Sequence, residues 1–267
     1  MKQAFLDFAN TPLLWQKKQF GLAQFDIQPL TTIDFTPEAI PAQLRLGHQV
    51  EHIFNQLLRY TSKYTVLAKG VQIKRHKQTL GELDFLLSEN DSKRLLHIEL
   101  TYKFYLIDPD ISEPIHRLVG PNRNDMFFTK MEKIKQQQLP LIHTPEGQET
   151  LQQLQLEVDQ LEQYCCFKAQ LFKPYAIPSP VIRPLNTDCI IGYWLRFEDF
   201  KGTSFKTAQY YIPYKYEWLH TPHKKVEWLS FFEVQLEINI KHLNQFSPMI
   251  WKLDTNGHLQ KLFVVWW

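Results

Sequence analysis

The chain has 267 residues, of which 44% are hydrophobic, 22% charged and 14% aromatic, and its formal net charge is +2. This composition excludes long-range disorder, and the near balance of charge gives no global indication of a nucleic-acid partner. The three cysteines lack zinc-ligand spacing and are too few for a disulfide framework, so we expect buried thiols in a reducing compartment. No apolar run reaches the ~18 residues that span a bilayer, and no signal-peptide core is seen. We therefore expect a cytoplasmic protein with no membrane partner.

The N-terminal half is predicted to begin with helices and continue in strands. Residues 1–40 are punctuated by prolines and are expected to form short helices and extended pieces. A helix is predicted from Pro41 to about Tyr60, where apolar residues recur at helical spacing. Turn residues at 88–92 join the last two of three predicted strands as a hairpin. These strands cover 64–75, 79–87 and 94–106.

Two more helices are predicted next, at 124–138 with Asn124 as its N-cap and at 146–163. From Cys166 onward the texture changes to aromatic, proline-punctuated strands, with one further helix at about 226–240. The strands are predicted at 167–172, 188–197, 208–213 and 262–267.

The element order predicts an α/β fold in three parts. Residues 1–40 form an N-terminal extension packed on the core. Residues 41–175 form the core itself. Residues 176–267 form a strand-rich C-terminal part, which either extends the same sheet or makes a small second domain.

Alternation along 94–106 separates an apolar face from a polar one that carries His97, Glu99, Thr101 and Lys103. On the preceding strand, Asp84 lies on the face opposite to Leu83 and Phe85. If the two strands pair as a hairpin, Asp84, Glu99 and Lys103 converge on one face of a twisted sheet. The alternative is a half-buried sheet with a solvated outer face, where alternating charges are routine.

The chain before this cluster is basic. Between His52 and Gly81 there is no Asp or Glu, whereas six cations occur: Arg59, Lys63, Lys69, Lys74, Arg75 and Lys77. A basic stretch that runs into a carboxylate cluster suits a site that attracts a polyanion beside a divalent metal. Lys74, Arg75 and Thr101 are therefore candidate substrate contacts. The alternative is an ordinary solvated face.

The residue types of the cluster suit metal-assisted hydrolysis. Two carboxylates with a backbone carbonyl suffice for Mg²⁺ (or Mn²⁺), which keeps several waters. The metal lowers the pKa of a bound water, and a lysine orients that water or stabilises developing charge. Glu51 lies at the edge of the buried stripe of the first predicted helix, where a metal would supply the partner that its carboxylate needs.

This order of residues resembles the PD-(D/E)xK nuclease superfamily: an acidic helix, a strand ending in Asp, and a strand with Glu and Lys. Glu51, Asp84, Glu99 and Lys103 fall onto those roles in sequence. The resemblance implies a restriction-endonuclease-like core with metal held by Asp84, Glu99 and Glu51. The chain departs from the pattern in two places. The usual Glu-x-Lys spacing would put the lysine at Thr101, and Leu83 replaces the usual Pro.

More narrowly, the chain resembles a bacterial group known as domain of unknown function 1853. The resemblance is carried by Gly81–Asp84, Glu99–Leu106, Gly120–Asn122 with Asp125 and Lys130, Lys168–Pro174, Gly192–Arg196 and Tyr216–Leu219. It covers most of the chain and implies a nuclease-like core without establishing an activity.

Other candidate contacts are less specific. Lys130 either reaches the site beside Asn122 and contacts phosphate, or its stem passes the core and its amine is solvated. The C-terminal aromatic residues either stack on bases of a single strand or fill the core of the sheet. His48 and His52, one helical turn apart, are expected on the surface or at the edge of the site.

The leading hypothesis is a Mg²⁺-dependent phosphodiesterase that hydrolyses nucleic acid, with DNA favoured over RNA, by a metal-activated water. Its rival is a catalytically inactive nuclease-fold module that binds nucleic acid or a protein. The sequence does not indicate the oligomeric state.

Overall fold

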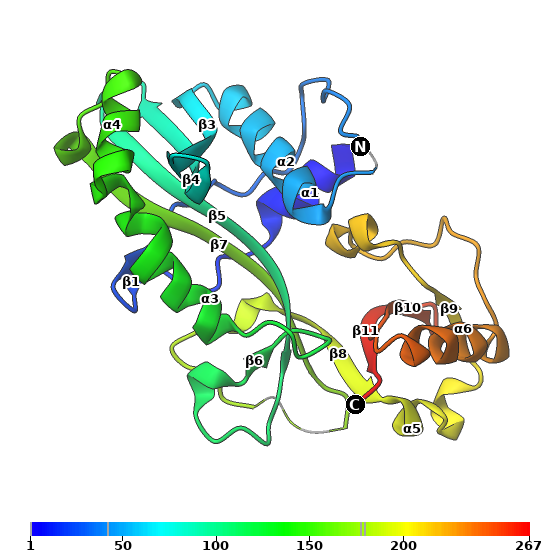
Figure 1. The fold of residues 1–267 in the computed structure, drawn as a ribbon. Helices are drawn as coiled ribbons and strands as arrows, with labels where there is room; N and C mark the ends of the chain where they lie inside the picture. The colour runs from blue at the N-terminus through cyan, green and yellow to red at the C-terminus, as the bar shows by residue number, and fades with distance from the viewer. Residues whose placement is uncertain (1, 42, 177, 179) are drawn as a thin grey trace. The chain divides into compact units, whose positions relative to one another are not determined.

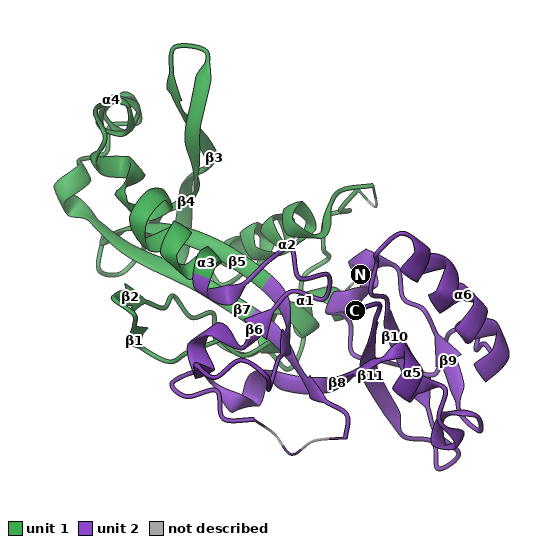
Figure 2. Ribbon diagram, turned by 60° about the horizontal axis from the view of Figure 1, so that its bottom comes forward, with its two compact units in different colours: residues 1–102, 129–168 green, residues 103–128, 169–267 purple. Residues whose placement is uncertain are grey.

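A computed structural model describes residues 2–41, 43–176, 178 and 180–267. The fold is mixed α/β, with a large mixed sheet and several helices (Figure 1). The chain divides into two compact units, residues 1–102 with 129–168 and residues 103–128 with 169–267 (Figure 2). Strands β5 and β7 contribute their first parts to unit 1 and their last parts to unit 2. Among the described residues, no helix is long and apolar enough to cross a membrane.

Unit 1 has three layers. Its strands follow the order β3-β4-β5-β7, and β3 with β4 and β4 with β5 are antiparallel. Helix α2 covers one face, where Phe54 contacts Phe85 at 4.9 Å between ring centroids. The segment from α3 to α4 covers the other face, where Leu141 and Ile142 pack with Leu86. The bounds are α1 Lys2–Asn10, β1 Lys18–Gln19, β2 Leu22–Ala23, α2 Leu46–Tyr60, β3 Tyr64–Arg75, β4 Gln78–Glu89, β5 Leu95–Ile107, α3 Phe127–Lys133, α4 Pro145–Gln153 and β7 Leu161–Pro174.

Unit 2 carries the mixed part of the sheet. Strand β8 is parallel to both β7 and β11, whereas β10 is antiparallel to β11 and β9. Helix α6 packs on these strands through Val234 and Ile238, which are both fully buried with Tyr210 and Val264. The bounds are β6 Leu118–Val119, β8 Ile190–Arg196, α5 Phe197–Phe200, β9 Gln209–Tyr211, α6 Phe231–Leu243, β10 Met249–Leu253 and β11 Leu259–Val265.

The predicted strands of the N-terminal half are confirmed, and β3 has the predicted bounds. The helix predicted from Pro41 begins only at Leu46, after Arg45 in extended conformation. The C-terminal strands at 167–172, 188–197, 208–213 and 262–267 correspond to β7, β8, β9 and β11, whereas β10 escaped prediction.

Three further helix predictions need correction. The helix predicted at 146–163 ends at Gln153, because Gln155 adopts a left-handed φ of 59° and the chain enters β7 at Leu161. The helix predicted at 124–138 begins at Phe127, so Asn124 is not its N-cap. The C-terminal helix begins at Phe231, where Ser230 and Glu233 form a capping box.

Candidate functional site

The site begins where the backbone pairing of β4 and β5 ends. The ladder runs from Ser88 opposite Leu95 to Phe85 opposite Ile98, and one more step in the same register sets Asp84 opposite Glu99. At this position the two strands are joined by hydrogen bonds between side-chain carboxylates and backbone N–H groups. The Leu100 N–H donates to Asp84 Oδ2 at 2.8 Å, and the Glu99 carboxylate accepts a hydrogen bond from the Asp84 backbone. These reciprocal bonds anchor each carboxylate to the backbone of the other strand.

The polar face of β5 is buried. His97 and Glu99 are 0% exposed, and Thr101 is 4% exposed. The alternative of a solvated outer face is therefore wrong for this part of the sheet. A buried carboxylate is costly unless it is hydrogen-bonded or paired, so its neighbours decide its chemistry.

A chain of hydrogen bonds surrounds Glu99. Its Oε2 accepts a hydrogen bond from Gln138 Nε2, and Gln138 Oε1 accepts one from Lys130 Nζ at 2.8 Å. On the other side, Glu99 Oε1 lies 3.1 Å from His97 Nε2. One glutamine thus links the Glu99 carboxylate to the Lys130 ammonium.

His97 is the neutral donor in this chain. Gln163 Nε2 lies 3.1 Å from His97 Nδ1 and also donates to Leu139 O at 2.6 Å. Because an amide nitrogen only donates, His97 Nδ1 accepts, and the proton of the neutral ring lies on Nε2 facing Glu99. Burial lowers the pKa of His97 to about 4, which keeps the ring neutral at physiological pH.

Gln138 reaches Glu99 from an irregular helix. Residues Ile134–Gln138 form a π-helical turn between α3 and the 3₁₀ turn Leu139–His143. π-helical turns cost stability and recur at functional sites because they redirect side chains. Here the turn brings Gln138 to a carboxylate 39 residues earlier in the chain.

Both carboxylates are shifted toward the protonated form. Burial, and next the charge of Glu99, raise the pKa of Asp84 to about 7. Burial raises the pKa of Glu99 to about 8, and the charge of Lys130 acts in the opposite direction on both groups. The pair therefore retains protons at neutral pH, and a nearby dication would favour their release.

Asp84 opens onto a cavity of about 120 Å³ in unit 1. Glu51 also lines this cavity, and its charge contributes to the raised pKa of Asp84. The Glu51 Oε2 atom lies 3.2 Å from Nδ1 of His48, and Glu51 is 40% exposed. The cavity is lined by Glu51, His52, Lys69, Gly70, Glu82, Asp84 and Phe85.

Across the described ranges, no group of three or more His, Cys, Asp and Glu side chains is arranged to hold a metal ion. Metal binding by Asp84, Glu99 and Glu51 therefore stays a prediction. Two hard carboxylate oxygens fit Mg²⁺, which is often bound by one or two carboxylates and keeps its waters. The hydroxyl of Thr101 on the same strand face is buried and has no hydrogen-bond partner among the described residues.

Comparison with known proteins identifies the family of this chain. The domain of unknown function DUF1853 matches residues 7–265. The chain belongs to this family. Neither the search of curated proteins nor that of solved structures found a match. The DUF1853 match spans residues of both units, including every residue predicted for the site.

Two of the predicted residues belong to unit 2 of this DUF1853 protein. Lys103 Nζ forms an ion pair with Asp125 Oδ2 at 2.5 Å, and both side chains are about one-third exposed. Asn122 Oδ1 accepts a hydrogen bond from Ser247 N at 2.8 Å, which ties two loops of the unit together. Their predicted catalytic and substrate roles stay predictions.

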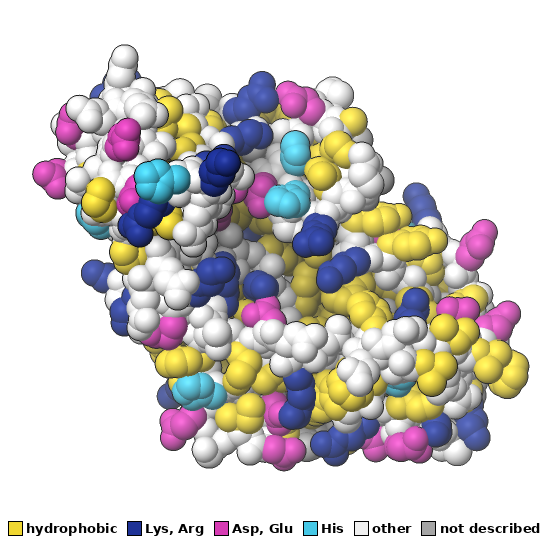
Figure 3. Space-filling view, in the orientation of Figure 1, with side chains coloured by type: hydrophobic (Ala, Val, Ile, Leu, Met, Phe, Trp, Pro, Cys, Tyr) yellow, Lys and Arg dark blue, Asp and Glu magenta, His cyan; other side chains and the backbone are white. Residues whose placement is uncertain are grey.

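The predicted basic run contains several cations that already have carboxylate partners. Arg75 Nε lies 2.6 Å from Glu146 Oε1, and Arg59 and Lys63 also form ion pairs. Lys69 lines the cavity beside Asp84, whereas Lys74 is exposed. On the face shown in Figure 3, lysine and arginine side chains are mixed with acidic ones.

Gln138 and Gln163 are members of the site that the sequence did not predict. Strand alternation already grouped His97 with Glu99, but neither glutamine has a local signal. Both come from segments that only the tertiary fold brings to β5.

Proposed function

We propose that this DUF1853 protein is a metal-dependent nuclease of the PD-(D/E)xK type that hydrolyses phosphodiester bonds of nucleic acid, with DNA favoured over RNA. One observation carries the proposal: the buried Glu99 and the half-buried Asp84 are each hydrogen-bonded to the backbone of the other strand, and the pKa of each is raised. Carboxylates with strongly raised pKa values cluster at functional sites, and burying two acids side by side costs stability unless function requires it.

Asp84 and Glu99 would hold Mg²⁺ or Mn²⁺, with Glu51 at the cavity wall as an assisting carboxylate. When bound, the metal would supply a water of lowered pKa and offset charge on the scissile phosphate. His97 and Gln138 position Glu99 through both of its oxygens. Such second contacts fix the orientation of a metal-binding carboxylate.

Two lysines compete for the superfamily's lysine role. Lys103 follows Glu99 on β5 and is engaged by Asp125. Lys130 is linked to Glu99 through Gln138, and its positive charge lowers the pKa of both Asp84 and Glu99. The proposal therefore assigns charge stabilisation at the site to Lys130 and leaves Lys103 to its ion pair.

The second candidate is an inactive nuclease-fold module that binds nucleic acid or a protein. It is favoured by one observation: no set of three metal-binding side chains is found within the described part of the chain. The two candidates differ in whether the acids bind metal and cut.

The test titrates Mn²⁺ and Mg²⁺ into the wild-type chain and into Asp84→Asn, and assays cleavage of single- and double-stranded DNA and RNA. We expect cleavage by wild type that Asp84→Asn reduces at least 100-fold, while Asp159→Asn, a change at an exposed position, keeps it. Metal binding without cleavage would favour a non-nucleic substrate, and neither binding nor cleavage would refute the nuclease.

The lysine assignment has its own comparison. Lys130→Met should lower cleavage roughly 100- to 1,000-fold, since one electrostatic stabiliser contributes about that much, while Lys103→Met should lose far less. The reverse order of effects would return the role to Lys103.

A further inference from the structure

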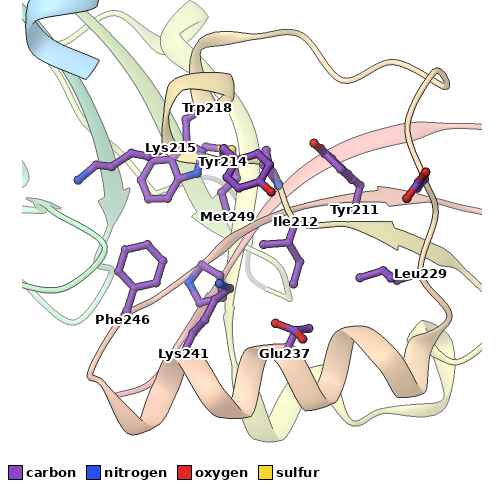
Figure 4. A pocket seen from close by; sticks show the side chains of 13 residues that line it. Tyr211, Ile212, Tyr214, Lys215, Trp218, Leu229, Glu237, Lys241, Phe246 and Met249 are labelled. Atoms are coloured by element: carbon purple, nitrogen blue, oxygen red, sulfur yellow. The ribbon is translucent and has the colours of Figure 1, made fainter. Parts of the chain in front are cut away.

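A second cavity lies within unit 2, and it shares no lining residue with the cavity beside Asp84. It has a volume of about 490 Å³, within the ~300–1,000 Å³ range of small-ligand sites. Its lining comes from the 3₁₀ turn at Lys215–Leu219, the chain before that turn, helix α6 and the start of β10 (Figure 4).

The cavity is lined by aromatic and aliphatic side chains and by charged ones. Tyr214 and Phe246 offer aromatic surface, and Met249 and Ile212 add aliphatic surface. Lys241 and Glu237 stand one turn apart on α6, and Glu227 adds a second carboxylate to the lining. Lys215 lines the cavity from the 3₁₀ turn, and its amine extends away from α6 (Figure 4). A ligand suited to these walls is flat and apolar on its faces, anionic at one side, and has hydrogen-bond donors at its edge.

Tyr214 is presented for stacking. It is 68% exposed, yet its backbone N–H donates to Glu217 Oε2 at 2.8 Å, and that oxygen also accepts from the Tyr211 hydroxyl at 2.8 Å. The rings of Tyr214 and Tyr216 lie parallel, with an interplanar angle of 4° and centroids 5.6 Å apart. An exposed ring held on an anchored backbone loses little entropy when another flat group stacks on it.

We propose that this cavity binds an unpaired nucleotide of a single-stranded nucleic acid, an inference that rests on the proposed nuclease function. The base stacks on Tyr214 and contacts Phe246, and Glu237 accepts hydrogen bonds from an amino group on the base edge. Lys241 pairs with the phosphate of this nucleotide, and Lys215, whose amine extends away from α6, pairs with a phosphate farther along the strand. Stacking on aromatic rings with lysines along the backbone is how sequence-tolerant single-strand sites work.

The test measures fluorescence polarisation of fluorescein-labelled ten-nucleotide single strands, DNA and RNA of mixed sequence, in EDTA so that nothing is cut. Tyr214→Ala should weaken binding roughly 5- to 100-fold, as expected for loss of base stacking, and Tyr214→Phe should bind like wild type. Phe232→Ala is the matched control, since Phe232 is an aromatic residue of similar exposure, 66%, that does not line the cavity.

Charge and strandedness give two further readouts. Lys241→Gln should lower the slope of log K against log salt by about 0.7, because one phosphate contact is lost. A duplex of the same sequence should bind independently of Tyr214, since its bases are stacked with one another. Equal binding by Tyr214→Ala and Phe232→Ala, or no binding of either single strand, would overturn the assignment.

Cleavage is assayed separately in Mn²⁺. If the protein cleaves but its binding of single strands does not depend on Tyr214, the assignment of the cavity is refuted and the nuclease proposal stands. If binding depends on Tyr214 but no cleavage occurs, the nuclease proposal is refuted and the protein is a nucleic-acid-binding module.

Discussion

Replacing Glu99 by glutamine tests the electrostatics of the site directly. The change keeps the length of a side chain that is 0% exposed and removes its charge. Burial raises the pKa of Glu99 from 4.5 to about 8, so the ionised form is strongly disfavoured in the folded chain. At about 1.36 kcal/mol per pKa unit, this shift corresponds to a cost of up to about 5 kcal/mol for keeping the charge buried.

The sign of the pH dependence follows from the two pKa values. Between pH 4.5 and about 8 the folded chain retains a proton on Glu99 that the unfolded chain has released. The free energy of unfolding of the wild type therefore falls as pH rises through this window and levels off above it. Glutamine does not titrate, so Glu99→Gln lacks this fall. Its amide would face the amide of Gln138, which costs about 1–2 kcal/mol for an unmatched hydrogen bond.

We expect Glu99→Gln to be more stable than wild type by about 3 kcal/mol at pH 9 and no more stable at pH 5. Urea unfolding in EDTA at both pH values measures the difference. Glu99→Gln also removes the charge that raises the pKa of Asp84, which adds to the advantage of the variant at pH 9, whereas the titration of groups distant from Glu99 cancels between the two proteins. Glu157→Gln, at an exposed position, is the control and should match wild type at both pH values. A wild type that is the more stable protein at pH 9 would refute the reasoning, because the carboxylate would then be stabilised, not penalised, in the folded chain.

Three other predictions follow from the same structure. The pKa of Asp84 is raised to about 7 and that of Glu99 to about 8, so Mn²⁺ binding at pH 7 should release roughly one to two protons. Calorimetry in buffers of different ionisation enthalpy measures this number. Binding without proton release would contradict a site made of both carboxylates. The ring of His97, whose pKa burial lowers to about 4, should show no NMR titration between roughly pH 5.5 and 9, and a midpoint near 6.5 would count against its neutral donor role. Gln155→Gly should raise the free energy of unfolding by about 0.5–1 kcal/mol, since Gln155 holds a φ of 59°, and a loss of stability in thermal unfolding would contradict this.

Local patterns predicted much of the sheet. Strict alternation along 94–106 and a turn at 88–92 were enough to predict the hairpin of β4 and β5, because the side-chain period of a strand is set by its own backbone. The prediction of a helix at 146–163 was wrong because it, too, relied on a local pattern alone. Leu151, Leu154, Val158 and Leu161 fit a helical stripe, yet Gln155 turns the chain and Leu161 begins a strand.

The division of the chain into units was beyond any local pattern. Residues 103–128 belong with residues 169–267, and residues 129–168 belong with residues 1–102. Such discontinuous units arise because β5 and β7 each run from one unit into the other. Sequence order alone predicts continuous domains.

By itself, the sequence determined that Asp84 and Glu99 face the same side of a hairpin, since strand alternation and register follow from neighbouring residues. Only the tertiary structure decided that this face is buried, that both carboxylates are shifted toward their protonated forms, and that Gln138 links Lys130 to Glu99. The physical reason is distance along the chain. Burial and charge depend on segments such as Gln138, 39 residues from Glu99, which reach β5 only when the whole unit has folded.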